Sequence, residues 1–169
     1  MSDIGRRIVT GHDENGKSIV IADGKPPQNH AMNSGGAEFI EIWNSPQATP
    51  TLTARPASEP TMREFAMMPA TGHLLRIIDI YPQSEGGSAT PMHRTATLDY
   101  AVVIEGEITL ILDDEERTLG PGSVIVQRGT DHAWENRTAK RTRMAFFHLA
   151  AQFDPELRKT LPDDRPLMR

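Results

Sequence analysis

The chain has 169 residues, no cysteine and a formal net charge of −5 at pH 7. This length suits one domain with a core of its own, and the lack of cysteine excludes disulfides, thiolate metal ligands and thiol catalysis. The acidic balance argues against a nucleic-acid partner, and because no apolar leader or apolar run of about 20 residues is present, we predict a cytoplasmic protein with no membrane partner.

The first part of the chain is predicted to form an arm outside the main domain. Asn15-Gly16 supplies the positive φ angles of a tight turn between two β-prone runs, which indicates a hairpin. The expected segments are, in chain order, a strand at 6–11, a strand at 17–22, an irregular loop at 23–36, a strand at 38–43 and a surface loop at 44–59.

Short β-branched runs separated by turn residues fill the centre of the chain, in keeping with its 13 glycines and 13 prolines. The strands predicted there cover residues 74–81, 98–104, 107–112, 117–119, 123–127 and 143–150. Asp154 followed by Pro155 predicts one helical turn near the end. We therefore expect an all-β protein with an N-terminal arm (1–70), a barrel (71–150) and a C-terminal tail (151–169).

Two histidines and a carboxylate are predicted to meet inside the barrel. Alternate residues of an extended segment share a face, so His93, Thr95 and Asp99 should point in one direction. The same rule groups His132 with Trp134 on a separate strand. Side chains of this kind, brought together from two strands, can surround one metal ion.

This pattern resembles the cupin family over roughly residues 72 to 150. The second cupin motif reads Gly-x5-Pro-x-Gly-x2-His-x3-Asn. Gly122, Gly129, His132 and Asn136 match it, with one residue fewer between the two glycines. Gln127 and its neighbour Arg128 stand where proline is usual.

The first cupin motif has His-x-His, three or four residues, Glu, six residues and Gly. Here it reads His93-x-Thr95-x3-Asp99-x6-Gly106, so threonine replaces the second histidine and aspartate the glutamate. The resemblance implies a double-stranded β-helix, which is a jelly-roll barrel. It also implies a homodimer in which the arm adds strands to a partner's sheet; the alternative is an arm that packs on its own barrel.

The resemblance further implies a metal site. His93, Asp99 and His132 would form a two-histidine, one-carboxylate set for a divalent ion such as iron, manganese, zinc or nickel. Thr95 is a poor ligand, but it would hydrogen-bond a metal-bound water. In the alternative interpretation His132 is a hydrogen-bonded residue of the barrel mouth, and Asp99 pairs with Arg94.

Further side chains are predicted to bind substrate together with Thr95. His148 shares the parity of Phe146 on the last strand and is the candidate to replace the missing motif histidine. Trp134 offers a flat wall for an aromatic ring, or else it merely fills the barrel. Arg76 lies in an apolar strand, so it must face solvent or pair inside, where it would clamp a substrate carboxylate.

Three functions remain open. The first is a metal-dependent enzyme that oxidises, isomerises or decarboxylates a small organic acid or an aromatic or phenolic compound, with His132 and Asp99 as catalytic residues. The second is a metal-free module that binds a small ligand without catalysis. The third is a metal-free epimerase or lyase in which His132 is the general base and Asp99 orients it.

Overall fold

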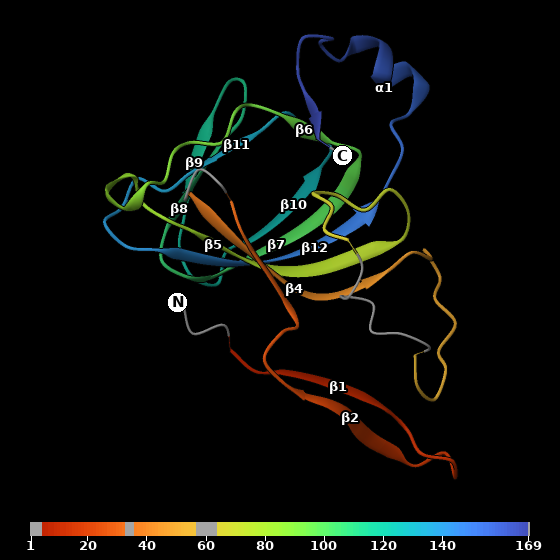
Figure 1. The fold of residues 1–169 in the computed structure, drawn as a ribbon. Helices are drawn as coiled ribbons and strands as arrows, with labels where there is room; N and C mark the ends of the chain where they lie inside the picture. Colours follow the sequence, from red (N-terminus) through yellow and green to blue (C-terminus); the bar gives the residue numbers. More distant parts are fainter. Residues whose placement is uncertain (1–4, 33–35, 57–63, 169) are drawn as a thin grey trace.

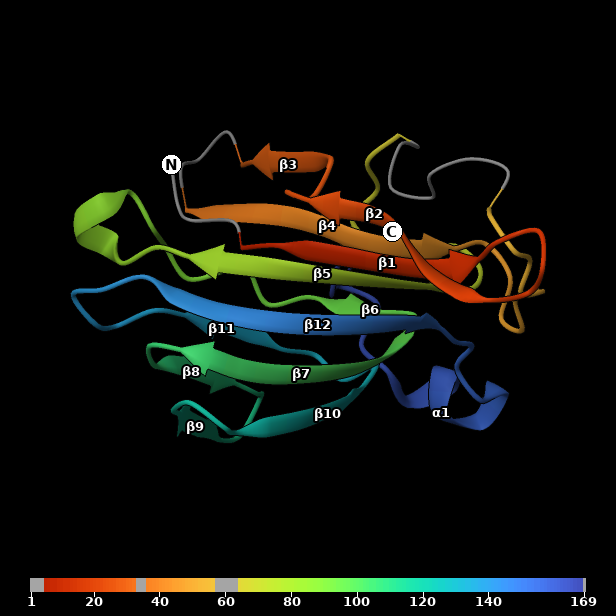
Figure 2. The same ribbon diagram turned by 90° about the horizontal axis from the view of Figure 1, so that it is seen from below.

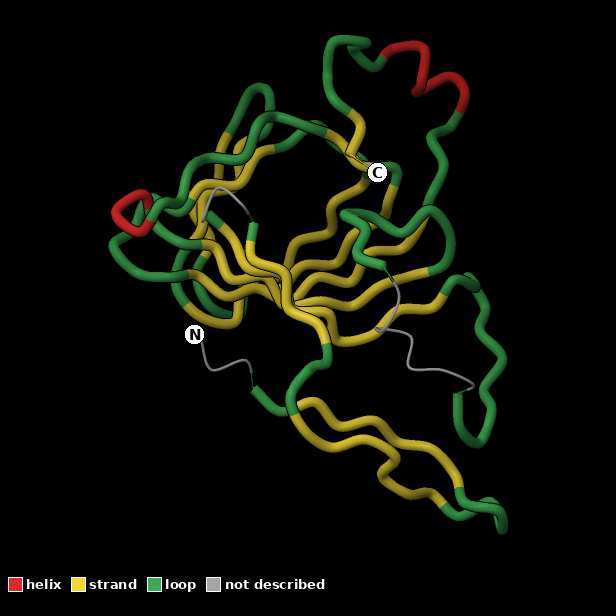
Figure 3. Tube along the Cα trace, viewed as in Figure 1, coloured by secondary structure: helices red, strands yellow, loops and turns green. Residues whose placement is uncertain are grey.

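The computed structural model describes residues 5–32, 36–56 and 64–168. Within them, a sheet of six strands and a sheet of three strands face each other, and a two-stranded hairpin stands apart (Figure 1). Among the described residues, helix is limited to one turn of 3-10 helix at Gln83–Glu85 and to α1 (Pro155–Thr160) (Figure 3). The predicted all-β jelly-roll barrel is confirmed.

The larger sheet carries three of the polar side chains that are discussed below, namely Asp99, Gln127 and His148. Its strands are, from edge to edge, β10 (Val124–Arg128), β7 (Thr97–Glu105), β12 (Thr142–Ala150), β5 (His73–Ile80), β4 (Ala37–Ser45) and β3 (Gln28–Ala31), all antiparallel to their neighbours (Figure 2). Asp99 on β7 lies opposite His148 on β12 and opposite Gln127 on β10. Residues directly opposite each other share a face, so these three side chains form one row.

The smaller sheet contains β11 (Ala133–Glu135), β8 (Ile108–Ile111) and β9 (Glu116–Leu119). A further pair, β6 (Arg94–Thr95) and β13 (Leu167–Met168), runs parallel. Just before β6, His93 forms an isolated bridge with His132, through backbone hydrogen bonds of 3.0 and 2.8 Å. The backbone therefore places the two predicted histidines side by side.

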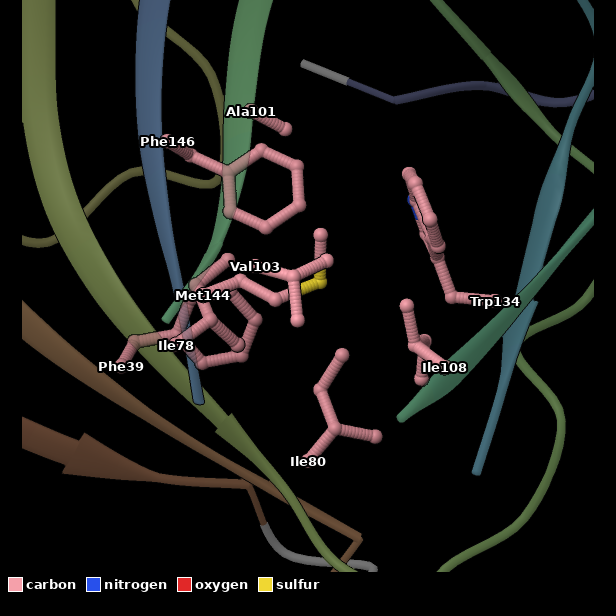
Figure 4. Packing of buried hydrophobic residues seen from close by; sticks show 9 residues of the cluster. All are labelled: Phe39, Ile78, Ile80, Ala101, Val103, Ile108, Trp134, Met144 and Phe146. Carbon is pink, nitrogen blue, oxygen red and sulfur yellow. The ribbon is translucent and has the colours of Figure 1, made fainter. Parts of the chain in front are cut away.

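The core lies between the two sheets. Alternation along each strand sends every second side chain inward, which is why β7 buries Ala101 and Val103 on the same face as Asp99. Ile108 and Trp134 approach from the smaller sheet (Figure 4). The full cluster of buried apolar side chains is Phe39, Ile78, Ile80, Ala101, Val103, Ile108, Trp134, Met144 and Phe146.

The predicted N-terminal hairpin is confirmed as β1 (Arg7–His12) and β2 (Ser18–Gly24), joined by a turn that ends at Gly16 with φ of 77°. It projects from the barrel (Figure 1), and Ile8 and Val20 are exposed on it. A hairpin of two strands is marginally stable by itself. The predicted homodimer, in which this hairpin would meet a partner, stays a prediction.

Three local outcomes complete the fold. β3 lies within residues 23–36, so the expectation that this whole segment is irregular was wrong. The sequence Gln-Asn-His-Ala has no strand pattern of its own, and it forms a strand because it pairs with β4. The predicted helical turn is confirmed, because Asp154 caps α1 by accepting from two backbone N–H groups at 2.9 and 3.2 Å. No helix in the described residues is long and apolar enough to cross a membrane.

Candidate functional site

A cavity of about 220 Å³ opens between the two sheets and has one polar end. The histidine, carboxylate and carboxamide side chains that line it are His93, Asp99, Gln127, His132 and His148. Each of these residues is at most 5% exposed. Polar side chains buried this deeply need hydrogen-bond partners, so their contacts define what the site can do.

His148 and Asp99 form a buried pair across β12 and β7. Nδ1 of His148 lies 2.9 Å from Oδ1 of Asp99. A carboxylate only accepts, so Nδ1 carries the proton and the lone pair of a neutral imidazole sits on Nε2. That Nε2 is buried and has no hydrogen-bond partner among the residues that the structure describes. The pair thus leaves one proton acceptor unsatisfied on a residue that lines the cavity, and a carboxylate orients its ring.

Gln127 links this pair to His132. Its Nε2 lies 3.1 Å from Oδ2 of Asp99 and 3.1 Å from Nε2 of His132. Together with the contact to His148, this engages both carboxylate oxygens of Asp99. The motif comparison noted Gln127 only as a residue in the place of proline, although a polar side chain ending the run Val124-Ile-Val126 was a signal of an inward role.

The two predicted histidines meet at the same end. His132 donates from Nδ1 to the carbonyl of Thr130 at 2.9 Å, and His93 likewise faces the carbonyl of Pro91 at 2.7 Å. Their ring centroids are 4.2 Å apart. Burial, and then repulsion from His93, lowers the pKa of His132 from 6.5 to about 4, so this imidazole is neutral at pH 7.

Beneath these histidines lies a buried ion pair. Arg94 contacts Asp131 with two hydrogen bonds of 2.7 and 2.8 Å, and both residues are buried. The interpretation that Arg94 pairs with Asp99 is therefore wrong: neighbours in sequence lie on opposite faces of an extended segment, and Arg94 turns away from His93. Since Arg94 follows His93 and Asp131 precedes His132, the pair clamps the two histidine-bearing segments together.

The residues present do not fit the predicted metal set. His93 and His132 do come together, but both oxygens of Asp99 already accept hydrogen bonds from neighbouring side chains. Nε2 of His132 is also occupied, by Gln127. Across residues 5–32, 36–56 and 64–168, no group of three or more histidine and carboxylate side chains is arranged to hold a metal ion.

Two predicted substrate-binding residues lie outside the cavity lining. Arg76 is fully buried, forms an ion pair with Glu41 at 2.9 Å and donates to the carbonyls of residues 66 and 67. Thr95 is also buried and accepts from the hydroxyl of Thr97 at 2.8 Å. A direct contact of either side chain with substrate stays a prediction.

An aromatic wall stands beside His148. Phe146 stacks on the His148 ring at 5.4 Å, and Trp134 meets Phe146 edge-on at 5.9 Å. Trp134 therefore faces inward, as the parity of its strand predicts, and it lines the cavity. In the part of the chain that the structure describes, the rest of the lining includes methionines that the sequence patterns did not single out, namely Met32, Met67, Met68 and Met168.

Comparisons with known proteins agree on one family. A family model described as "Cupin domain" matches residues 81–148. Phomopsin biosynthesis cluster protein C' of Diaporthe leptostromiformis is 36% identical over 156 aligned residues, covering 86% of this chain and 78% of that protein. The cupin-domain-containing oxidoreductase fogC of Aspergillus ruber is 34% identical over 145 residues, covering 83% and 70%.

Among solved structures, the polyketide cyclase RemF from Streptomyces resistomycificus is similar in fold. It is 17% identical, with a TM-score of 0.49 and a coverage of 72% of each chain.

Proposed function

The chain belongs to the cupin family, and from that premise we propose that it is a cupin-type enzyme that rearranges a small ring-bearing molecule by proton transfer at His148. The observation that carries the proposal is the His148–Asp99 pair, joined at 2.9 Å. His148 lines the cavity, and its Nε2 is buried without a hydrogen-bond partner among the described residues. A histidine oriented by a buried carboxylate is a common form of general base.

The mechanism uses the chain's own groups. Nε2 of His148 takes a proton from a C–H group of the substrate next to a carbonyl, and the Asp99 carboxylate stabilises the imidazolium that forms. The same proton then returns to another atom of the substrate, so the net reaction is an isomerisation and needs no oxidant. His132 serves less well as the base, because its Nε2 accepts from Gln127 and its pKa is about 4.

The shape of the cavity supports a ring-bearing substrate. Trp134 and Phe146 offer aromatic faces next to His148, and aromatic pairs contribute about 0.5–1.5 kcal/mol beyond their area burial. Several relatives are named as proteins of biosynthesis clusters, which favours a small organic molecule over a macromolecule.

The names of other relatives favour an oxidoreductase, and the second candidate is therefore the metal-dependent oxidoreductase that the sequence led us to expect. It requires about one iron, manganese, zinc or nickel ion per chain. Elemental analysis of the purified protein decides between the two candidates. Activity that disappears on chelation and returns with one of these ions would establish the oxidoreductase, whereas full activity after exhaustive chelation would reject it.

Deuterium exchange tests the proton transfer directly. With 2-tetralone in D₂O as the probe, we expect the protein to accelerate exchange at the carbon next to the carbonyl, as followed by proton NMR. His148→Gln keeps a polar side chain but cannot shuttle a proton, so exchange should slow by about 10²- to 10⁴-fold. His12→Gln changes an exposed histidine of the hairpin and is the matched control. Exchange by His148→Gln at the wild-type rate would remove His148 from the mechanism.

A further inference from the structure

The orientation of the Gln127 carboxamide is fixed by its neighbours. The atom 3.1 Å from Oδ2 of Asp99 must be a donor, because a carboxylate only accepts. The same atom lies 3.1 Å from Nε2 of His132, which is an acceptor because Nδ1 of that ring donates to a carbonyl. Both hydrogens of the Gln127 amide group are therefore committed, and the carboxamide cannot flip without losing both bonds.

The other end of the carboxamide is unsatisfied. Oε1 of Gln127 is buried and has no hydrogen-bond partner within the described part of the chain, although Gln127 lines the cavity. An acceptor buried in this way carries a desolvation penalty that a ligand donor would remove. Nε2 of His148, two strands away in the same row, is in the same condition.

The charge of the cavity restricts what that ligand donor can be. Asp99 is the carboxylate of the lining, and no lysine or arginine occurs among the lining residues that the structure describes. His132 is neutral at pH 7 and brings no positive charge. A carboxylate ligand would have to sit beside Asp99 and against the carboxamide oxygen in a poorly solvated space. A neutral hydroxyl meets no such repulsion.

We infer that Gln127 is a substrate-binding residue whose Oε1 accepts a hydrogen bond from a hydroxyl group of the ligand, so that the site selects a hydroxylated ring over the matching carboxylate. This inference rests on the proposed function, since it places the ring ligand in the same cavity. The sequence left both organic acids and phenolic compounds open as substrates. A hydroxyl group that donates to Oε1 favours the phenolic, enolic or alcoholic class. Gln127 supplies recognition, and His148 supplies the base.

Three probes with one ring test the selectivity: 4-methylphenol, 4-methylbenzoate and toluene, titrated calorimetrically into the full chain at pH 7. We expect 4-methylphenol to bind at least about tenfold more tightly than 4-methylbenzoate, and several-fold more tightly than toluene. This part of the test needs no variant. Benzoate binding as tight as the phenol would overturn the inference and leave proton transfer at His148 standing, because deuterium exchange measures that separately.

Gln127→Met keeps the length of the side chain and removes the oxygen. We expect this substitution to weaken the binding of 4-methylphenol by about tenfold and to leave the binding of toluene unchanged. Gln152→Met, at an exposed position, is the control. An equal loss for both probes would assign Gln127 a merely structural role and overturn the inference. If none of the three probes binds the wild-type protein, the ring-binding cavity itself is refuted, and the proposed function falls together with the inference.

Discussion

The polar end of the cavity and the methionine-rich rest of its lining are built on opposite principles. At the polar end, hydrogen bonds of 2.7 to 3.1 Å hold each ring and carboxamide in one orientation. The rest of the lining includes Met32, Met67, Met68 and Met168, whose unbranched side chains adapt to irregular shapes. The contrast indicates that the polar groups are held in fixed positions, whereas the methionine side chains can adjust to ligands of different shapes.

The largest effect is expected from breaking the buried Arg94–Asp131 ion pair, which joins the two segments that carry His93 and His132. Asp131→Ala leaves Arg94 charged and buried without its partner, and we expect the free energy of unfolding to fall by about 3–5 kcal/mol. Urea denaturation at pH 7 measures this. Asp23→Ala, which breaks the exposed pair with Arg6, should change stability little. Equal effects of the two substitutions on the free energy of unfolding would show that the buried Arg94–Asp131 pair does not stabilise this part of the barrel.

A second effect follows from His132. Its pKa is about 4 in the folded chain and near 6.5 when unfolded, so between these pH values only the unfolded state takes up the proton. Stability should therefore fall as the pH drops from 6.5 to 4, by about 3 kcal/mol in total. His132→Gln should lose this part of the pH dependence, and the exposed control His12→Gln should retain it. Urea titrations at several pH values measure the difference, and identical profiles for all three proteins would contradict the assignment.

The smallest effect concerns Trp134, whose ring contacts the rings of His132 and Phe146. Trp134→Ala removes one aromatic face, and we expect the binding of 4-methylphenol to weaken by about 1 kcal/mol. Trp134→Phe, which keeps a ring, should lose less. Calorimetry again provides the measurement. An aliphatic alcohol that binds as well as the aromatic one would show that Trp134 fills the barrel without shaping the site.

Local periodicity was sufficient to predict most strands and the meeting of His93 with His132, because alternation assigns each side chain a face. It did not identify the partner of Asp99. His148 lies 49 residues further along the chain, and only the register between β7 and β12 brings the two together. Arg94, five residues before Asp99, was the nearer cation, and it proved to belong to Asp131.

The segments that were missed have a common physical cause. β3 and β13 contain four and two residues, too few for a pattern to emerge, and each exists because a neighbouring strand offers its backbone groups. The methionine lining escaped notice for a similar reason, since Met168 reaches the cavity only through the pairing of β13 with β6. These elements form because of tertiary contacts, so they could not be predicted from the local sequence.

The position of β13 has a practical consequence for handling the protein. Met168 lines the cavity, and the carbonyl of Pro166 accepts from the backbone of Arg94 at 3.0 Å. A purification tag fused after Arg169 would begin two positions beyond Met168 and would place added side chains close to a residue that lines the cavity. Protein for calorimetry should carry its tag at the amino end instead, before the hairpin of β1 and β2 that projects from the barrel (Figure 1).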